Sequence, residues 1–206
     1  MKRKRILAMI LTVASCLSLA VSVSAANTTA RKATDFKDYD AKSWYAEAVS
    51  AAVNNGLLYG KSSTTLDPNG DMTRAEMAAI INRSFGCYKA ADISQYKDVS
   101  NSKWYYKDVA LAVQMGTYVG RSSSAMAPDA PISRQEAMTV VARALELDYD
   151  SYSKTDLSAF SDRSEISNWA MPYVRAMVGA DYIHGRGKVL APLDNICLLY
   201  TSDAAD

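Results

Sequence analysis

Apolar side chains recur at three- and four-residue spacing just after residue 44, with polar residues between them. Val49, Ala52 and Val53 would lie on one face of an α-helix with this spacing. Gly56 follows at a position where glycine commonly ends a helix. The pattern therefore predicts an amphipathic helix that opens at Trp44 and stops before Gly56.

A second apolar stripe, which includes Ile80 and Ile81, follows a loop-like segment. Residues 60–70 are rich in Gly, Ser, Thr, Asn and Pro, a composition typical of loops. Thr73 and Glu76 have the spacing of a capping box, in which each side chain accepts a hydrogen bond from the backbone N–H of the other residue. A second helix is therefore predicted to start after Thr73.

The same arrangement occurs again with an offset of 60 residues and no gap, so that residues 36–83 align with residues 96–143. Ser133 and Glu136 repeat the capping box, and a third copy begins at Phe160 with an offset of 64 or 65. The matching positions include Asp38, Asp98 and Asp162; Trp44, Trp104 and Trp169; Gly60, Gly120 and Gly185; and Arg74 and Arg134. Repetition at a fixed period indicates a repeat architecture, so we predict an all-α fold of three helix-loop-helix repeats.

The third copy departs from the pattern after Ile196, because no Arg-x-Glu follows. The stretch from Leu198 to Asp206 resembles translated sequencing adapter. We therefore predict an incomplete third repeat, and a natural protein that continues beyond it. The predicted organisation is a signal peptide at 1–26, a linker at 27–34, a first repeat at 35–86, a second at 95–147, a linker at 148–158, a partial third repeat at 159–196 and a non-native tail at 197–206.

The first 26 residues have the pattern of a secretory signal peptide. Four basic residues at 2–5 precede an apolar stretch from Ile6 to Val23, and small residues follow it. We expect cleavage after Ala25 or Ala26. Two alternatives stay open: an uncleaved membrane anchor, and a lipoprotein modified at Cys16.

The amino-acid composition excludes several functional classes for this chain. The chain has 49% hydrophobic and 22% charged residues, which is ordinary for a folded protein. Without the four basic residues at 2–5, 19 basic residues stand against 22 acidic ones, a net charge of −3, which does not suit a nucleic-acid binder. Outside the signal and the predicted tail, Cys87 is the only cysteine and His184 the only histidine, so we predict neither disulfides, nor a metal site, nor a cofactor.

The three tryptophans of the chain occupy equivalent places, one in each repeat. An indole ring can pack the core of its repeat, or it can offer a flat apolar wall to a sugar ring. Both interpretations stay open for Trp44, Trp104 and Trp169.

Arg74 and Arg134 each occupy the first residue of a predicted helix. The helix dipole disfavours a cation there by roughly 0.3–1 kcal/mol. The unpaired backbone N–H groups of the same turn form an anion site, and a guanidinium binds a carboxylate through two parallel hydrogen bonds. We therefore predict that both arginines bind an anion; the alternative is pairing with a neighbouring carboxylate.

Two further positions recur in all three repeats. One is an aspartate before the first helix, for which local turn capping is the simpler interpretation and ligand contact the alternative. The other is a loop glycine, which suits a positive φ and also lets a ligand approach the backbone. These residues are Asp38, Asp98 and Asp162, and Gly60, Gly120 and Gly185.

Several motifs in fixed order resemble the S-layer homology family over residues 35–196. They include Phe36-x-Asp38, Trp44-Tyr45, Asp67-Pro68 and Thr73-Arg74-Ala75-Glu76. The resemblance implies three repeats in one pseudo-threefold unit, with the capped helices in a central bundle and with grooves between repeats that bind secondary cell wall polysaccharide, often bearing pyruvate ketals. It implies that Arg74 and Arg134 contact the ketal carboxylate, and that the recurring tryptophans and glycines line the grooves.

The sequence and the resemblance together predict a secreted, non-catalytic protein that binds anionic, pyruvylated cell wall polysaccharide, or a peptidoglycan-linked glycan, without a covalent bond. It would act in the cell wall, the S-layer or elsewhere on the cell surface, with no nucleic acid partner, and would contact a membrane only through an uncleaved signal. Glu76 and Glu136 are explained by capping, so no glycosidase pair is assigned. The alternatives are the anchor fragment of a surface enzyme, such as a glycan hydrolase, and a structural surface-layer or envelope-tether protein.

Overall fold

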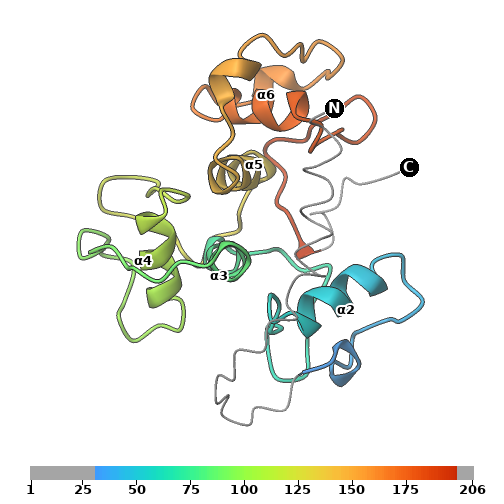
Figure 1. Ribbon diagram of the computed structural model, residues 1–206, viewed down its shortest axis with the longest axis vertical. Helices are drawn as coiled ribbons and strands as arrows, with labels where there is room; N and C mark the ends of the chain where they lie inside the picture. Colours follow the sequence, from blue (N-terminus) through green and yellow to red (C-terminus); the bar gives the residue numbers. More distant parts are fainter. Residues whose placement is uncertain (1–30, 199–206) are drawn as a thin grey trace, which may run out of the picture. The chain divides into compact units, whose positions relative to one another are not determined.

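The structure is a computed structural model that describes residues 31–198. The predicted signal peptide and the tail after Leu198 lie outside the described residues. Within residues 31–198 the secondary structure is helical, without strands, as the sequence predicts (Figure 1). The α-helices are α2 (Ala46–Asn54), α3 (Arg74–Phe85), α4 (Tyr106–Gln114), α5 (Arg134–Ala144) and α6 (Met171–Gly179), and the short 3-10 helices are η1 (Ala33–Asp35), η2 (Tyr149–Tyr152) and η3 (Arg163–Glu165).

Both predicted capping boxes form. The Thr73 hydroxyl accepts from the N–H of Glu76 at 3.2 Å, and the Glu76 carboxylate accepts from the N–H of Thr73 at 2.8 Å. Ser133 and Glu136 make the same two bonds at 3.4 and 2.9 Å. These bonds satisfy N–H groups that the first turn of a helix leaves unpaired, so the sequence located the starts of α3 and α5 correctly.

The predicted start of the first helix was two residues too early. Trp44 lies in a turn, and α2 begins at Ala46 with Tyr45 as its N-cap. The predicted end is confirmed, because α2 stops at Asn54 and Gly56 follows with φ +68°. This left-handed conformation is the one that glycine adopts readily after a helix.

The helices pack in a staggered way, across the boundaries of the repeats. α3 of the first repeat packs against α4 of the second, and α5 of the second repeat packs against α6 of the third. The side chains of α3 and α4 share one buried cluster with Ile132, while Met138 and Ala142 of α5 share another with Val174 and Leu190. The capped helices α3 and α5 therefore bury their apolar faces together with the following repeat, whereas Val49 and Val53 of α2 pack with Phe36 and Leu66 of their own repeat.

A closed ring of backbone hydrogen bonds links the three repeats just before their capping positions. The N–H of Met72 donates to Ile196 at 2.8 Å, that of Ile196 to Ile132 at 3.0 Å, and that of Ile132 to Met72 at 2.9 Å. Isolated β-bridges flank this ring and follow the same cyclic order. The predicted pseudo-threefold bundle stays a prediction, because a third central helix would fall on residues outside those described.

The segment 148–158 is more than the linker that the sequence predicts, because it contains η2, which packs on α6. Cys197 and Leu198, assigned to a non-native tail, pack against buried clusters of the first two repeats. Among helices within residues 31–198, none has the length and apolar character needed to cross a membrane.

Candidate functional site

Two cavities occupy equivalent places in the first two repeats; we call them groove 1 and groove 2. Their volumes are about 310 and 560 Å³. In each, the loop after the first helix faces the capped helix of the same repeat, and the tryptophan of the following repeat completes the wall. The residues that line groove 1 include Tyr59, Gly60, Lys61, Asp67, Glu76, Arg83, Trp104 and Leu198, and those that line groove 2 include Arg74, Val119, Gly120, Arg121, Glu136, Arg143 and Trp169.

The tryptophan rings are not core residues. Trp104 in groove 1 is 60% exposed, Trp169 in groove 2 is 52% exposed, and Trp44, which lines neither groove, is 70% exposed. The rings of Trp44 and Trp104 meet the following tyrosine edge to face, at 5.7 and 5.4 Å between centroids. Each ring thus leaves much of its surface open to a planar partner.

Arg74 lies in the wall of groove 2, and its guanidinium is already engaged. Nη1 lies 2.9 Å from a Glu136 carboxylate oxygen, Nε donates to the carbonyl of Met126 at 2.9 Å, and Nη2 donates to that of Val119 at 3.1 Å. Only 5% of the residue is exposed. The pairing alternative left open by the sequence is therefore what the structure shows for Arg74.

The positions equivalent to Arg74 in the other two repeats differ from it. Arg134 is 2% exposed, donates from Nε to the carbonyl of Leu190 at 2.9 Å, and lines neither groove. In groove 1 the corresponding wall position belongs to Leu198. The two predicted anion ligands are thus both buried, and the first two grooves are chemically unequal.

A more exposed cation follows the recurring loop glycine in every repeat: Lys61, Arg121 and Arg186. The side chain of Arg121 is 43% exposed and holds the Glu136 carboxylate with two bonds of 3.1 Å, from Nε and Nη2. Sequence reasoning missed these residues, although a basic residue after each glycine was a visible signal.

The two grooves differ in charge. Groove 2 places Arg74, Arg121 and Arg143 against one carboxylate, Glu136, which leaves two positive charges in excess.

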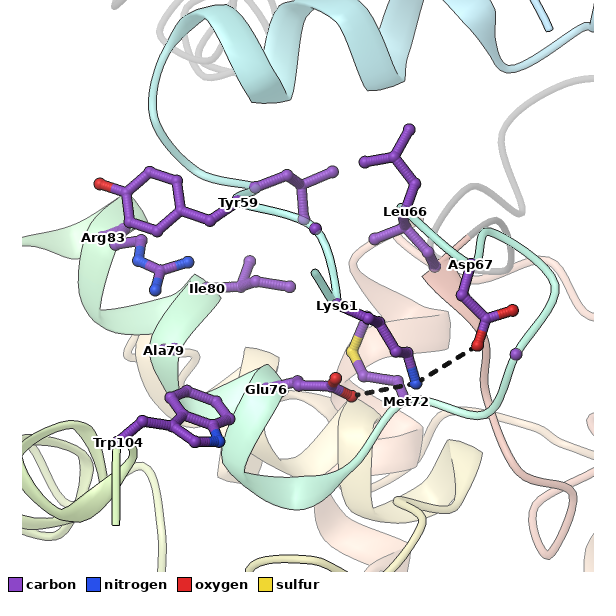
Figure 2. Close-up of a pocket in the computed structure, with 14 residues that line it drawn as sticks. Tyr59, Lys61, Leu66, Asp67, Met72, Glu76, Ala79, Ile80, Arg83 and Trp104 are labelled. Atoms are coloured by element: carbon purple, nitrogen blue, oxygen red, sulfur yellow. Dashed lines mark ion pairs between the residues drawn. The ribbon is translucent and has the colours of Figure 1, made fainter. Parts of the chain in front are cut away.

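In groove 1 the two positive charges of Lys61 and Arg83 are balanced by the two negative charges of Asp67 and Glu76. Figure 2 shows Lys61 between the two carboxylates, at 3.7 Å from Asp67 and 3.6 Å from Glu76. Arg83 stacks over the Tyr59 ring at 4.1 Å. Groove 2 is therefore the better place for an anion, while groove 1 offers a neutral surface.

Groove 2 keeps Glu136 ionised. Burial alone would raise the pKa of this carboxyl, but hydrogen bonds from Arg121 and the N–H of Ser133, with the charges of Arg74 and Arg121, bring the pKa below its ordinary value. The ionised carboxylate in turn fixes both guanidinium groups.

The recurring aspartates clamp a distant loop, which corrects the expectation of local turn capping. Asp38 accepts from the N–H groups of Leu66 and Asp67, at 2.9 and 2.7 Å. The same pair of bonds joins Asp98 to residues 126 and 127, and Asp162 to residues 190 and 191. Despite the opposing effect of burial, these bonds lower the pKa of Asp38 and Asp98. Each carboxylate thus holds the loop of its own repeat in place.

The recurring glycines are required by close packing. A Cβ on Gly60, Gly120 or Gly185 would overlap an aromatic ring and a backbone carbonyl. Gly60 and Gly185 have φ values of +77° and +76°, but Gly120 lies outside the positive-φ region, so the expectation of positive φ was wrong for Gly120. Gly60 and Gly120 line grooves 1 and 2.

Comparison with known proteins identifies the repeats. Residues 35–78, 95–138 and 159–196 each match the S-layer homology domain. The chain belongs to the S-layer homology family. It is 35% identical over 116 residues to the Surface-layer 125 kDa protein of Lysinibacillus sphaericus, covering 54% of this chain and 10% of that protein.

Other relatives include an Endoglucanase of Bacillus sp. (strain KSM-635), 27% identical over 88% of this chain and 19% of the enzyme. The S-layer protein sap of Bacillus anthracis is 23% identical over 92% of this chain and 22% of that protein. This S-layer homology chain thus spans about a tenth to a fifth of the relatives' length. The family consists of binding and anchoring domains, and the relatives include surface-layer proteins. Together they indicate that this chain is a secreted protein of the cell surface.

Proposed function

We propose that this chain anchors to the bacterial cell wall by binding anionic, pyruvylated wall polysaccharide in grooves 1 and 2. The observation that carries the proposal is the composition of groove 2. A half-exposed indole, Trp169, stands beside a site with two positive charges in excess. Apolar ring faces and forked cations are what a sugar bearing a carboxylate needs.

In this proposal each residue of groove 2 has a separate role. Trp169 stacks on a sugar ring, and Arg121, whose side chain is 43% exposed, donates to the ketal carboxylate. Arg74 contributes positive charge from the wall, because its own donors are taken by Glu136 and two backbone carbonyls. Arg134 lines neither groove and is assigned no part in this site, and Asp98 and Gly120 shape the loop.

Groove 1 binds the same polymer differently. Its cations, Lys61 and Arg83, are balanced by Glu76 and Asp67. We assign to it an uncharged sugar of the chain, stacked on Trp104.

The test is retention on purified wall polysaccharide, with and without its pyruvyl groups. We expect strong retention on the pyruvylated polymer and clearly weaker retention on the depyruvylated one. Retention should also fall with salt, because the contacts with the anion are partly exposed. Equal retention on both polymers would remove the role assigned to Arg121 and Arg74.

The relatives suggest what the anchor carries. Because the chain spans a tenth to a fifth of an endoglucanase and of surface-layer proteins, we propose that it serves as the anchoring part of a longer surface protein. Sequencing the gene in full tests this directly: a downstream catalytic or lattice-forming domain supports the proposal, and its absence refutes it.

A further inference from the structure

A third cavity, of about 690 Å³, lies in the third repeat and shares no residue with grooves 1 and 2; we call it the basic pocket. The connector at residues 153–158, η3 and the first turns of α6 form its walls. The residues that line it include Lys154, Thr155, Asp156, Arg163, Ser164 and Arg175, and also Ser153.

The basic pocket carries a strong excess of positive charge. Lys154, Arg163 and Arg175 face one carboxylate, Asp156, which leaves two positive charges in excess. Both oxygens of Asp156 accept bonds from Ser158, at 2.8 and 2.7 Å, and these bonds lower its pKa. Within residues 31–198 none of the three cations forms an ion pair closer than 4 Å.

Arg175 has a donor to spare. Its Nη1 donates to the carbonyl of Ser153 at 2.6 Å, which ties α6 to the connector. Its Nε is shielded from solvent and has no hydrogen-bond partner among the described residues. A shielded donor without an acceptor costs about 1–3 kcal/mol, so this arrangement favours an acceptor supplied from outside.

The repeat architecture does not explain these charges. The positions equivalent to Arg175 are Ser50 and Ala110, and that equivalent to Arg163 in the second repeat is Val99. The helix-loop-helix unit therefore folds without a cation at either place. The connector has a counterpart before the second repeat, where Asp92 and Ser94 form the same bond as Asp156 and Ser158, but Ala90 occupies the position of Lys154.

We propose that the basic pocket binds a phosphate group carried by a small sugar or polyol. A phosphomonoester bears about −1.5 to −2 charge at neutral pH, which matches the excess of the pocket. Guanidinium groups bind phosphate oxygens in pairs, Lys154 adds a compact charge, and the hydroxyls of Thr155 and Ser164 supply further donors. The volume leaves room for a sugar ring beside the phosphate. This site is independent of the wall-binding grooves.

The experiment is a calorimetric titration of the full chain with glucose 1-phosphate at low salt, with glucose and pyruvate as comparison ligands. We expect saturable binding of glucose 1-phosphate, and at least tenfold weaker binding of the other two. The double variant Lys154→Gln/Arg163→Gln removes two exposed cations with little effect on packing. It should bind glucose 1-phosphate at least tenfold more weakly, because charge-assisted bonds are lost.

The matched control is Lys103→Gln/Lys107→Gln, which removes two exposed charges from the second repeat and should bind as the parent does. Three results would overturn the proposal: no saturable binding of glucose 1-phosphate, pyruvate binding of equal strength, or equal weakening in both double variants. Retention of Lys154→Gln/Arg163→Gln on pyruvylated wall polymer should be unchanged; a parallel loss there would show that the pocket is not a separate site.

Discussion

At the scale of single residues, repetition in the sequence hides differences in environment. Arg74 and Arg134 occupy the same place in two repeats, yet Arg74 lines groove 2, while Arg134 donates to the carbonyl of Leu190 and lines neither groove. Arg121, which the capping pattern does not mark, has the more exposed guanidinium in groove 2. Charge and exposure, rather than motif position, decide which side chain can meet a ligand.

Replacing Trp169 by alanine should weaken binding to pyruvylated wall polysaccharide by about tenfold or more, since large aromatic side chains dominate binding energies at such sites. Trp44→Ala removes an exposed indole that lines neither groove, and is the matched control. Surface plasmon resonance on immobilised polymer measures both. Equal losses in the two variants would contradict the assignment of groove 2.

Glu136 should make stability depend on acid pH. Its pKa is lowered in the folded state, so its contribution is present above the unfolded-state value of about 4.3 and is lost as pH falls through the folded-state value. We expect the free energy of unfolding to fall less steeply with acidification in Glu136→Gln than in the parent protein.

Urea unfolding at a series of pH values between 2.5 and 7, roughly spanning the carboxyl range, measures this slope. The same change at exposed Glu47 on α2 controls for the loss of a charge and should leave the slope unchanged. An unaltered slope in Glu136→Gln would show that Arg121 and Arg74 do not stabilise the carboxylate.

At the scale of elements, each capped helix depends on the following repeat. In addition to the bonds of the capping box, the N–H groups of Arg74 and Ala75 donate to the carbonyls of residues 130 and 128 in the second repeat. Those of Arg134 and Gln135 donate to carbonyls at 194 and 192 in the third. The first turn of α3 and of α5 is therefore completed by a loop that lies 53 to 60 residues further along the chain.

Removing a cap should cost a predictable amount. Ser133→Ala removes the acceptor for the N–H of Glu136 and should lower the free energy of unfolding by about 1 kcal/mol. Ser133→Thr keeps the hydroxyl, as Thr73 does in α3, and should be close to neutral. Chemical unfolding with an unchanged m-value measures both; a neutral Ser133→Ala would mean that the box does not stabilise α5.

At the scale of the whole molecule, the ring of bonds through Met72, Ile132 and Ile196 and the staggered packing of helices link the three repeats. Isolated repeats would expose the apolar faces that now meet across repeat boundaries. We therefore expect residues 31–198 to unfold as one cooperative unit, although tandem repeats in extended arrays often do not.

Ile132→Ala tests this coupling, because Ile132 is fully buried in the ring. It should lower the free energy of unfolding by about 2–5 kcal/mol. The loss should appear equally in the fluorescence of Trp44, Trp104 and Trp169, read in single-tryptophan variants. Leu193→Ala, at an exposed position, should change the free energy of unfolding by at most about 0.5 kcal/mol. Distinct midpoints for the three reporters would contradict a single cooperative unit.

The sequence by itself determined the local features: three repeats, the capping boxes at Thr73 and Ser133, and the end of α2 before Gly56. These depend on residues a few positions apart, whose hydrogen bonds and φ preferences are set by the local chain. It also placed the three tryptophans at equivalent positions of the repeats, but it did not determine how exposed they are.

Only the tertiary structure decided the partners across repeats. That Arg74 pairs with Glu136, that Asp38 clamps the loop at Leu66 and that α3 packs on α4 all join residues distant in the chain. Because the same local sequence pattern occurs in every repeat, the sequence cannot distinguish packing within a repeat from packing with the next one. The physical choice is made by burial of apolar faces and by pairing of buried charge, which depend on the whole folded chain.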